Sequence, residues 1–464
     1  MASALVCGGL AAALSGVFPG IYNTTDSVRS LATSMILITC AIMPISSYTF
    51  ATYFTLRSGG QTLVTFLFDS CFVWVCCVPL AYCLSRFTDL TIIPLFAICL
   101  SLIAGAVLMM ILGKDPIIGY KSLLQGCGLL MKKNYAGGKG LLPAFMSYLD
   151  IWTPMIFAAL AVAVAYKAGL FNIGVSGQML IGGFIASITV GYSDLPAVIA
   201  KPLVIVICMV IGALAGSFIG LLKYKFNINE VVSAIMLNYI FQYIISFFIL
   251  TFFVNPITRQ SNPVGENARL TLQNVQIAGM KTVIPLGFVL AIIAVVVMHY
   301  FINHTRIGFE LKAVGANKKA ATYAGVNANK NIMLAMAISG ALAGLAGATY
   351  YLGYLSSIQP KVLASTGFDS IAVCLLGNSN PIGIVASSFL VTIISKGSMY
   401  MNSSVGLPQE IASLITGLML LFAACGVYIR ARLKRTKDRL DQQDRLEAAE
   451  RKDSASEEGK EDDR

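Results

Sequence analysis

The chain has 464 residues, of which 57% are hydrophobic and only 12% charged, and its mean hydropathy is +0.77. These values exclude a soluble enzyme, and the apolar runs, which are continuous rather than alternating, exclude a β-barrel and predict transmembrane helices. The net charge of +11 comes from short loops and the residues after the last apolar run, where basic residues orient membrane helices, so it does not indicate nucleic-acid binding.

About thirteen apolar runs follow one another along the chain. We therefore expect an all-α, polytopic transmembrane helix bundle of about 12–13 spans. The runs lie near residues 3–20, 31–56, 62–85, 90–112, 148–166, 173–192, 201–222, 231–254, 283–302, 331–355, 362–377, 381–399 and 407–429. The 11 cysteines include no CxxC pair and fall mostly inside these runs, so neither a disulfide framework nor a metal site is predicted.

The first 99 residues carry polar motifs between their apolar runs: YNTTD at 22–26, YFTLRSGG at 53–60, TFLFDS at 65–70 and LSRFT at 84–88. These motifs resemble the last helices of a multidrug and toxin extrusion (MATE) exporter. An intact exporter of that family has two packed helical lobes with the path between them. The resemblance therefore implies an appendage or fused fragment in residues 1–99, with the fourth apolar run a hybrid of two families.

Four further blocks of polar and small residues interrupt the apolar runs after residue 100. They are FNIGVSGQM at 171–179, NEVVS at 229–233 with MLNY at 236–239, LKAVGAN at 311–317 with YAGV at 323–326, and GFDSIAV at 367–373 with LG at 376–377 and Pro381. In this order they resemble the permease subunits of ABC importers for nucleosides, relatives of the ribose and branched-chain amino acid permeases. The resemblance covers about residues 100–430 and implies a transmembrane permease domain there.

Five polar side chains in these blocks are candidates for lining a solute path: Asn172, Gln178, Asn238, Asp369 and Glu230. Amides both donate and accept hydrogen bonds, which suits an uncharged polar solute, although the same bonds can hold helices together. Glu230 begins an apolar run, where a carboxylate also stabilises a helix N-terminus. Asp369 is an acid near membrane depth, and it can either contact the solute or anchor a broken helix.

The loop at 303–330 combines small residues with five cations and the single acid Glu310, so we expect it in the cytoplasm. A short helix of small residues can dock into a groove on a partner. In the family that the chain resembles, this kind of loop meets the ATP-binding subunit. We therefore expect a coupling role for Gly308, Leu311, Gly315, Asn317, Ala320, Tyr323 and Gly325, with an ordinary solvated loop as the alternative.

The basic residues at 430–437 are also expected in the cytoplasm, and the four runs between them and 303–330, an even number, agree with this. The MATE resemblance would place residues 57–60 there too. Seven runs separate 57–60 from 303–330, so the two topologies conflict if every run crosses once. The charged tail at 431–464 cannot bury a core, and we expect it to be cytoplasmic and partly disordered.

Two glycine repeats of the GxxxG type predict close helix contacts rather than sites, one at Gly212, Gly216 and Gly220 and one at Gly340 and Gly344. No P-loop sequence, GxxxxGK[ST], is present, so the chain cannot hydrolyse ATP alone. We expect no enzymatic activity, no metal and no cofactor of its own, with ATP used by a partner subunit.

The predicted function is that of the permease subunit of a bacterial ABC importer for a small polar solute, located in the plasma membrane. The resemblance alone implies nucleosides as the solute. It also implies the partners: an ATP-binding subunit, a second permease subunit, a lipid-anchored substrate-binding protein and the membrane lipids. The alternatives are an ion-coupled, MATE-like exporter and a non-functional fusion of two membrane proteins.

Overall fold

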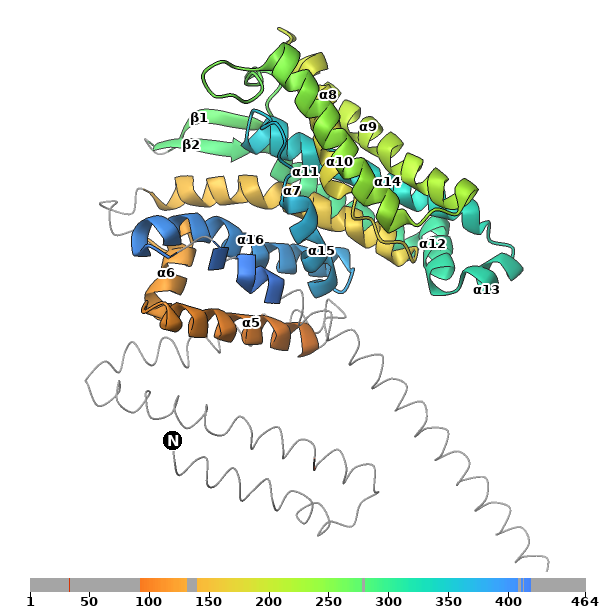
Figure 1. Ribbon diagram of the computed structural model, residues 1–464, viewed down its shortest axis with the longest axis horizontal. Coiled ribbons are helices and arrows are strands. Elements are labelled where there is room, and N and C mark those ends of the chain that lie inside the picture. The colour runs from red at the N-terminus through yellow and green to blue at the C-terminus, as the bar shows by residue number, and fades with distance from the viewer. Residues whose placement is uncertain are drawn as a thin grey trace, which may run out of the picture. The chain divides into compact units, whose positions relative to one another are not determined.

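The computed structural model describes Thr33 and residues 92–131, 140–277, 280–407, 410, 411 and 413–418. The chain divides into two compact units, residues 1–86 and 87–464, and all the elements below belong to the second unit (Figure 1). Apart from Thr33, the first three predicted spans lie outside the described residues, as do the MATE-like motifs, most of the last span and the charged tail. The division of the chain at residue 99 therefore stays a prediction.

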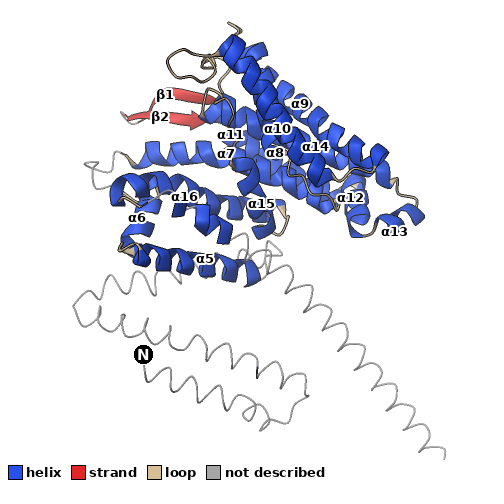
Figure 2. Cartoon of the chain, viewed as in Figure 1, coloured by secondary structure: helices blue, strands red, loops and turns tan. Residues whose placement is uncertain are grey.

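The described part of the chain is a helix bundle with one small sheet (Figure 2). The helices before the sheet are α5 (Ile92–Ile111), α6 (Pro116–Gly126), α7 (Leu141–Lys167), α8 (Val175–Ala186) with η5 (Ser187–Gly191), α9 (Ala197–Phe226) and α10 (Glu230–Phe248) with η6 (Ile249–Phe253). Strands β1 (Thr271–Ile277) and β2 (Met280–Pro285) form the sheet. The helices after it are α11 (Leu286–His304), α12 (Arg306–Ala316), α13 (Lys318–Tyr323), α14 (Ala328–Thr349) with η7 (Tyr350–Tyr354), α15 (Thr366–Leu376) and α16 (Pro381–Val405).

Six of the described helices are long and apolar enough to cross a membrane: Leu141–Lys167, Ala197–Phe226, Glu230–Phe253, Leu286–His304, Ala328–Tyr354 and Pro381–Val405. Each predicted apolar run between residues 90 and 399 contains a helix. The prediction of an all-α, polytopic membrane bundle is therefore confirmed. The antiparallel hairpin of β1 and β2 was not predicted from the sequence.

Helix α7 forms the centre of the bundle, because its apolar window is 94% buried, whereas those of α10 and α11 are each 28% buried. A helix that is apolar on every side is either buried or faces lipid. The outer helices leave large apolar side chains exposed, for example Leu214 on α9 and Val296 on α11. This pattern is that of helices bordering a membrane.

Glycines bring α9 and α14 into backbone contact. A Cβ atom at Gly212 would meet the carbonyl oxygen of Gly340, and one at Gly344 would meet that of Cys208. Gly216 faces the carbonyl of Met336 in the same way. The interpretation of both GxxxG repeats as helix contacts is thus correct, since any larger side chain would push the two helices apart.

The bundle has two ends of different character (Figure 1). At one end, here called the hairpin end, the 254–285 segment covers α7: Thr271 Oγ1 donates to Asp150 Oδ1 at 3.0 Å, and the Leu270 amide donates to the Leu352 carbonyl at 2.9 Å. At the opposite end, α12 and α13 form what we call the coupling segment, residues 305–325. It contacts the end of α7, where Gly315 lies against the backbone of Gly169.

Helix α15 is too short to cross a bilayer. Its 11 residues span about 16 Å at 1.5 Å per residue, roughly half of the hydrocarbon thickness. It is preceded by residues 355–365, which form no helix or strand. The predicted span at 362–377 is therefore only partly helical, as expected for a broken helix.

Candidate solute path and coupling segment

Three predicted path residues lie together in a buried group, here called the amide cluster, which consists of Asn172, Gln178, Asn238 and Ser339. Asn172 lies between α7 and α8. Its Nδ2 donates to Gln178 Oε1 at 3.0 Å and to Ser339 Oγ on α14 at 2.8 Å. Its Oδ1 accepts from the Gly174 amide at 2.9 Å and from Gln178 Nε2 at 3.4 Å. The side chain of Asn172 therefore has a partner for each of its donors and acceptors.

Asn238 binds the same polypeptide segment from α10. Its Oδ1 accepts from the Gly177 amide at 2.9 Å, and its Nδ2 donates to the Ile173 carbonyl at 3.0 Å. Residues 171–174 and the first turn of α8 are thus held between α10 and α14 by side-chain amides that satisfy free backbone groups. Asn172, Gln178 and Asn238 are 0%, 1% and 2% exposed. These bonds are of the kind that holds helices together, and contact with a solute stays a prediction.

Glu230 lies apart from the amide cluster, at the start of α10. Its Oε2 accepts from Lys223 Nζ, at the end of α9, at 2.6 Å. The helix itself is capped by Asn229, whose side chain accepts from the Val231 amide at 2.8 Å. In this structure the Glu230 carboxylate connects α9 and α10, and its contact with a solute also stays a prediction.

Asp369 lies in the first turn of α15, and its half-buried side chain hydrogen-bonds Ser365. It shares no described contact with the three amides. The start of α15 nevertheless lies against the start of α8, because Ser176 Oγ donates to the Ala364 carbonyl at 2.9 Å and Gly367 abuts the Ser176 backbone. Two incomplete membrane helices therefore meet within the bundle.

Sequence reasoning missed two polar residues of this region, Gln242 and Lys361. Gln242 Nε2 donates to the Lys361 carbonyl at 2.6 Å, and the Lys361 amide donates to Ser246 Oγ at 2.7 Å. Gln242 follows Asn238 by four residues, one helical turn, which is the signal that could have identified it. Lys361 follows a proline between two apolar runs, so the sequence suggests an ordinary loop there.

The predicted coupling residues separate into an inner and an outer group. Leu311 is 2% exposed, and Gly308 and Gly315 lie against the backbone carbonyls of Phe301 and Lys167. These inner residues fix α12 to the ends of α11 and α7. Their small size is explained by packing inside this chain.

The outer group lies on and around α13, where Ala320, Tyr323 and Gly325 are exposed. Tyr323 is 94% exposed, which is unusual for so large a side chain. Asn317 caps the helix, because its Oδ1 accepts from the amides of Lys319 and Ala320 at 3.0 and 3.1 Å. An open groove of about 590 Å³ runs beside α13, lined by Lys318, Thr322, Gly325, Val326, Asn327, Ala328 and Asn329.

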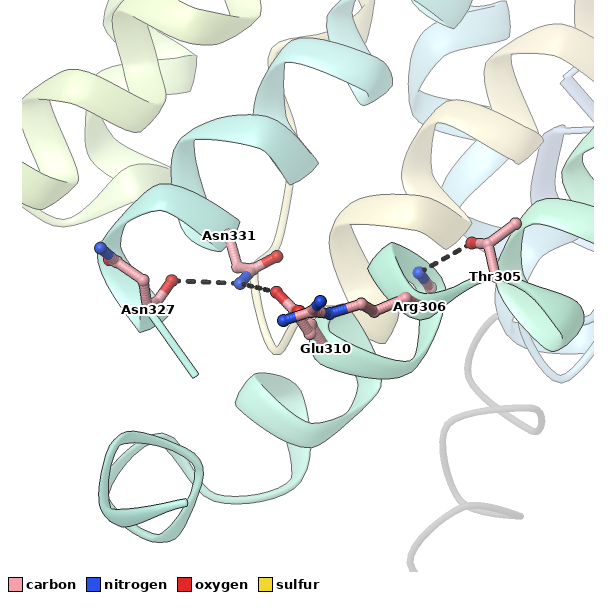
Figure 3. Close-up of polar contacts among 6 residues, drawn as sticks. Thr305, Arg306, Glu310, Asn327 and Asn331 are labelled. Carbon is pink, nitrogen blue, oxygen red and sulfur yellow. Dashed lines mark hydrogen bonds and ion pairs between the residues drawn. The ribbon is translucent and has the colours of Figure 1, made fainter. Parts of the chain in front are cut away.

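A polar network connects the coupling segment to α14 (Figure 3). Glu310 Oε1 accepts from Arg306 Nε at 2.9 Å, and its Oε2 accepts from Asn331 Nδ2 at 3.1 Å. Asn331 Nδ2 also donates to the Asn327 carbonyl at 3.1 Å, and Thr305 Oγ1 accepts from the Gly308 amide at 3.1 Å. The bond from Asn331, followed by that from Arg306, lowers the pKa of Glu310 below its ordinary value.

In the part of the chain that the structure describes, no three His, Cys, Asp or Glu side chains lie together so as to hold a metal ion. The site consists of the amide cluster and the coupling segment, of which α13 is largely exposed.

Residues 145–424 match the family described as "Branched-chain amino acid transport system / permease component". The chain belongs to this permease family. It is 34% identical over 358 residues to the nucleoside ABC transporter permease protein NupB of Lactococcus lactis, covering 75% of this chain and 95% of that protein. It is 37% identical over 344 residues to the guanosine ABC transporter permease protein NupP of Bacillus subtilis, covering 73% and 94%.

A further permease relative is the glucose ABC transporter permease protein TsgB13 of Haloferax volcanii, 27% identical over 342 residues, with 71% of this chain and 86% of that protein covered. No solved structure is a significant match. The predicted identity as an ABC transporter permease, a multi-pass protein of the plasma membrane, is confirmed. The permease match begins at residue 145, well after the MATE-like segment.

Proposed function

We propose that the chain is the translocation subunit of a bacterial ABC importer for nucleosides. The observation that carries the proposal is its similarity, over 95% and 94% of their lengths, to the nucleoside and guanosine permeases. The chemistry agrees, because an uncharged, polar solute is suited to a path with amide side chains. In this proposal Asn172, Gln178, Asn238, Asp369 and Glu230 lie along or support that path.

The partners in the proposal follow from the two ends of the bundle. The coupling segment faces the cytoplasm and binds an ATP-binding subunit through Ala320, Tyr323 and the groove beside α13. The hairpin end faces a lipid-anchored substrate-binding protein, and a second permease subunit completes the path. The charged tail is cytoplasmic in this topology, and ATP is consumed only by the partner.

Coupling in the proposal runs through α14. Movement of α12 would act on α14 through the bond between Glu310 and Asn331 (Figure 3). Ser339 lies eight residues further along α14, and it accepts from Asn172 in the amide cluster. Because α14 contacts α9 backbone to backbone, the two helices would move together and carry the amide cluster with them.

The two alternative functions, an ion-coupled exporter and a non-functional fusion, depend on residues 1–99. Only Thr33 and residues 92–99 of that segment are described, and no observation favours an exporter. The permease is therefore the function proposed.

The proposal is tested by co-purification and uptake with the tagged full chain and with a variant lacking residues 1–99. We expect both forms to recover an ATP-binding subunit from the host membrane and to support ATP-dependent uptake of labelled guanosine. Loss of both activities from the shortened form alone would support a working role for residues 1–99. Absence of both from the full chain would contradict the importer.

A further inference from the structure

Residues 355–365 run into the bundle from the hairpin end as an irregular segment. Near the hairpin end, the Val264 amide donates to the Ser356 carbonyl at 2.8 Å. At its other end, the Ala364 carbonyl accepts from Ser176 Oγ, at the start of α8. In a membrane, non-helical backbone is tolerated only where protein surrounds it or where it borders a water-filled cavity.

Lys361 lies between these two anchors, beside the central part of the α10 span. Its backbone is hydrogen-bonded to Gln242 and Ser246. These are the thirteenth and seventeenth of the 24 residues in the α10 span, Glu230–Phe253. The Lys361 side chain is nevertheless exposed, and the described ion pairs, Lys223–Glu230 and Arg306–Glu310, do not include it. A lysine at this depth is expected to face the bundle interior or water rather than lipid tails.

The backbone at Lys361 adds a second, independent observation. Its φ is +60°, in the left-handed region that residues with a Cβ seldom adopt. Outliers of this kind are held in place by their surroundings and cluster at functional sites. Here the bonds from Gln242 and to Ser246 hold the backbone in this conformation.

Gln242 holds the backbone of this lysine from α10. Its Nε2 donates to the Lys361 carbonyl, but its Oε1 is inaccessible and has no hydrogen-bond donor. A buried acceptor without a partner is unfavourable unless something else supplies the donor. Tyr239 and Tyr243 share the face of α10 next to that of Gln242, are 52% and 61% exposed, and offer aromatic rings.

We infer that the solute path runs along α10 and the 355–365 segment, and that Lys361, held there by Gln242, contacts the solute. The inference rests on the proposed function and deepens it. The ligand is a planar, uncharged, polar solute: its ring acceptors receive from the Lys361 ammonium, and its ring stacks on tyrosine. The amide cluster, buried behind this face, then supports the path.

The first test measures whether water reaches the side chain at position 361. The experiment compares the reaction of Lys361→Cys with a charged thiol reagent, in the assembled transporter, with that of the unmodified full chain. The control is Val296→Cys, because Val296 lies at the middle of α11 and is 63% exposed. We expect Lys361→Cys to react above the unmodified background, guanosine to slow that reaction, and Val296→Cys to stay unreactive. Absence of reaction at Lys361→Cys would overturn the inference.

The second test measures the contact itself. For Lys361→Gln we expect KM for guanosine uptake to rise about tenfold or more, because a charge-assisted hydrogen bond is lost, while recovery of the ATP-binding subunit stays unchanged. Lys361→Arg should restore most of the affinity. An unchanged KM in Lys361→Gln, with wild-type uptake intact, would overturn this inference alone. A wild type that transports no nucleoside would overturn the proposed function. The thiol reaction would still show whether water reaches position 361.

Discussion

At the scale of single residues, the permease uses its polar side chains largely to satisfy its own backbone. Asn172 and Asn238 bind the non-helical residues between α7 and α8. The sequence motif FNIGVSGQM brings Asn172 and Gln178 near each other along the chain. The bond that Asn172 donates to Ser339 on α14, and the bonds of Asn238 on α10 to the backbone of the motif, depend on long-range packing, so the motif alone could not predict them.

Replacing Asn172 by Ala should destabilise the folded protein. The change leaves the Gly174 amide and both functional groups of Gln178 without a buried partner, and each such loss costs about 1–3 kcal/mol. The measurement is the thermal unfolding of the purified protein in detergent. The matched control is Asn303→Ala, an exposed amide at the end of α11, for which we expect little change. Equal stability of the two variants would contradict the structural role.

Glu310 should make stability depend on pH in a defined direction. Its folded pKa is lowered from the ordinary value of 4.5 by bonds from Asn331 and Arg306, so the unfolded state takes up a proton first as pH falls. Its contribution is complete above about 4.5 and is lost as pH falls through the folded pKa. We expect the stability difference between wild type and Glu310→Gln to be constant from pH 8 to pH 6 and to shrink below pH 4.5. A difference that grows on acidification would contradict the network.

At the scale of elements, apolar runs predicted the long helices well because composition alone determines which segments can span a membrane. The same signal could not separate α15 from the irregular segment before it, since residues 362–365 are also mostly apolar. Nor could it identify β1 and β2, whose hairpin forms on the first half of α7 rather than from a strong strand pattern. Both features depend on contacts with distant helices.

The contact between α9 and α14 should not tolerate a side chain at Gly340. A Cβ there would overlap the Gly212 carbonyl, so Gly340→Ala is expected to cost about 1–3 kcal/mol through overpacking. The control is Gly417→Ala, because nothing lies within 4 Å of a Cβ at that position. The comparison is made by thermal unfolding in detergent, and equal losses at both positions would show that α9 and α14 are not in backbone contact.

At the scale of the whole molecule, different residues of the coupling segment serve the folding of this chain and its assembly with a partner. Gly315 and Ala320 carry the same sequence prediction, a role in coupling to the ATP-binding subunit. Gly315 lies against the backbone of Lys167, whereas Ala320 is exposed on α13. The sequence could not distinguish the two positions, because both are small residues in one basic loop.

Ala320→Arg should therefore give a folded permease that no longer recovers the ATP-binding subunit and transports nothing. Ala320→Ser, which keeps the residue small, should behave as wild type in co-purification and uptake. Gly315→Arg should instead reduce the amount of folded protein in the membrane, since the side chain has no room beside α7. Normal uptake by Ala320→Arg would contradict a coupling role for α13.

The glycines between α9 and α14 also determine which sequences can encode this bundle. At Gly344 the Cys208 carbonyl occupies the place of a Cβ, so every substitution adds an atom where there is no space. At Gly325 the restriction has a different origin, since φ is +84° and nothing lies within 4 Å. In a library of random variants selected for transport, Gly344 should thus accept no replacement, whereas Gly325 should still accept asparagine, the side chain best suited to left-handed backbone.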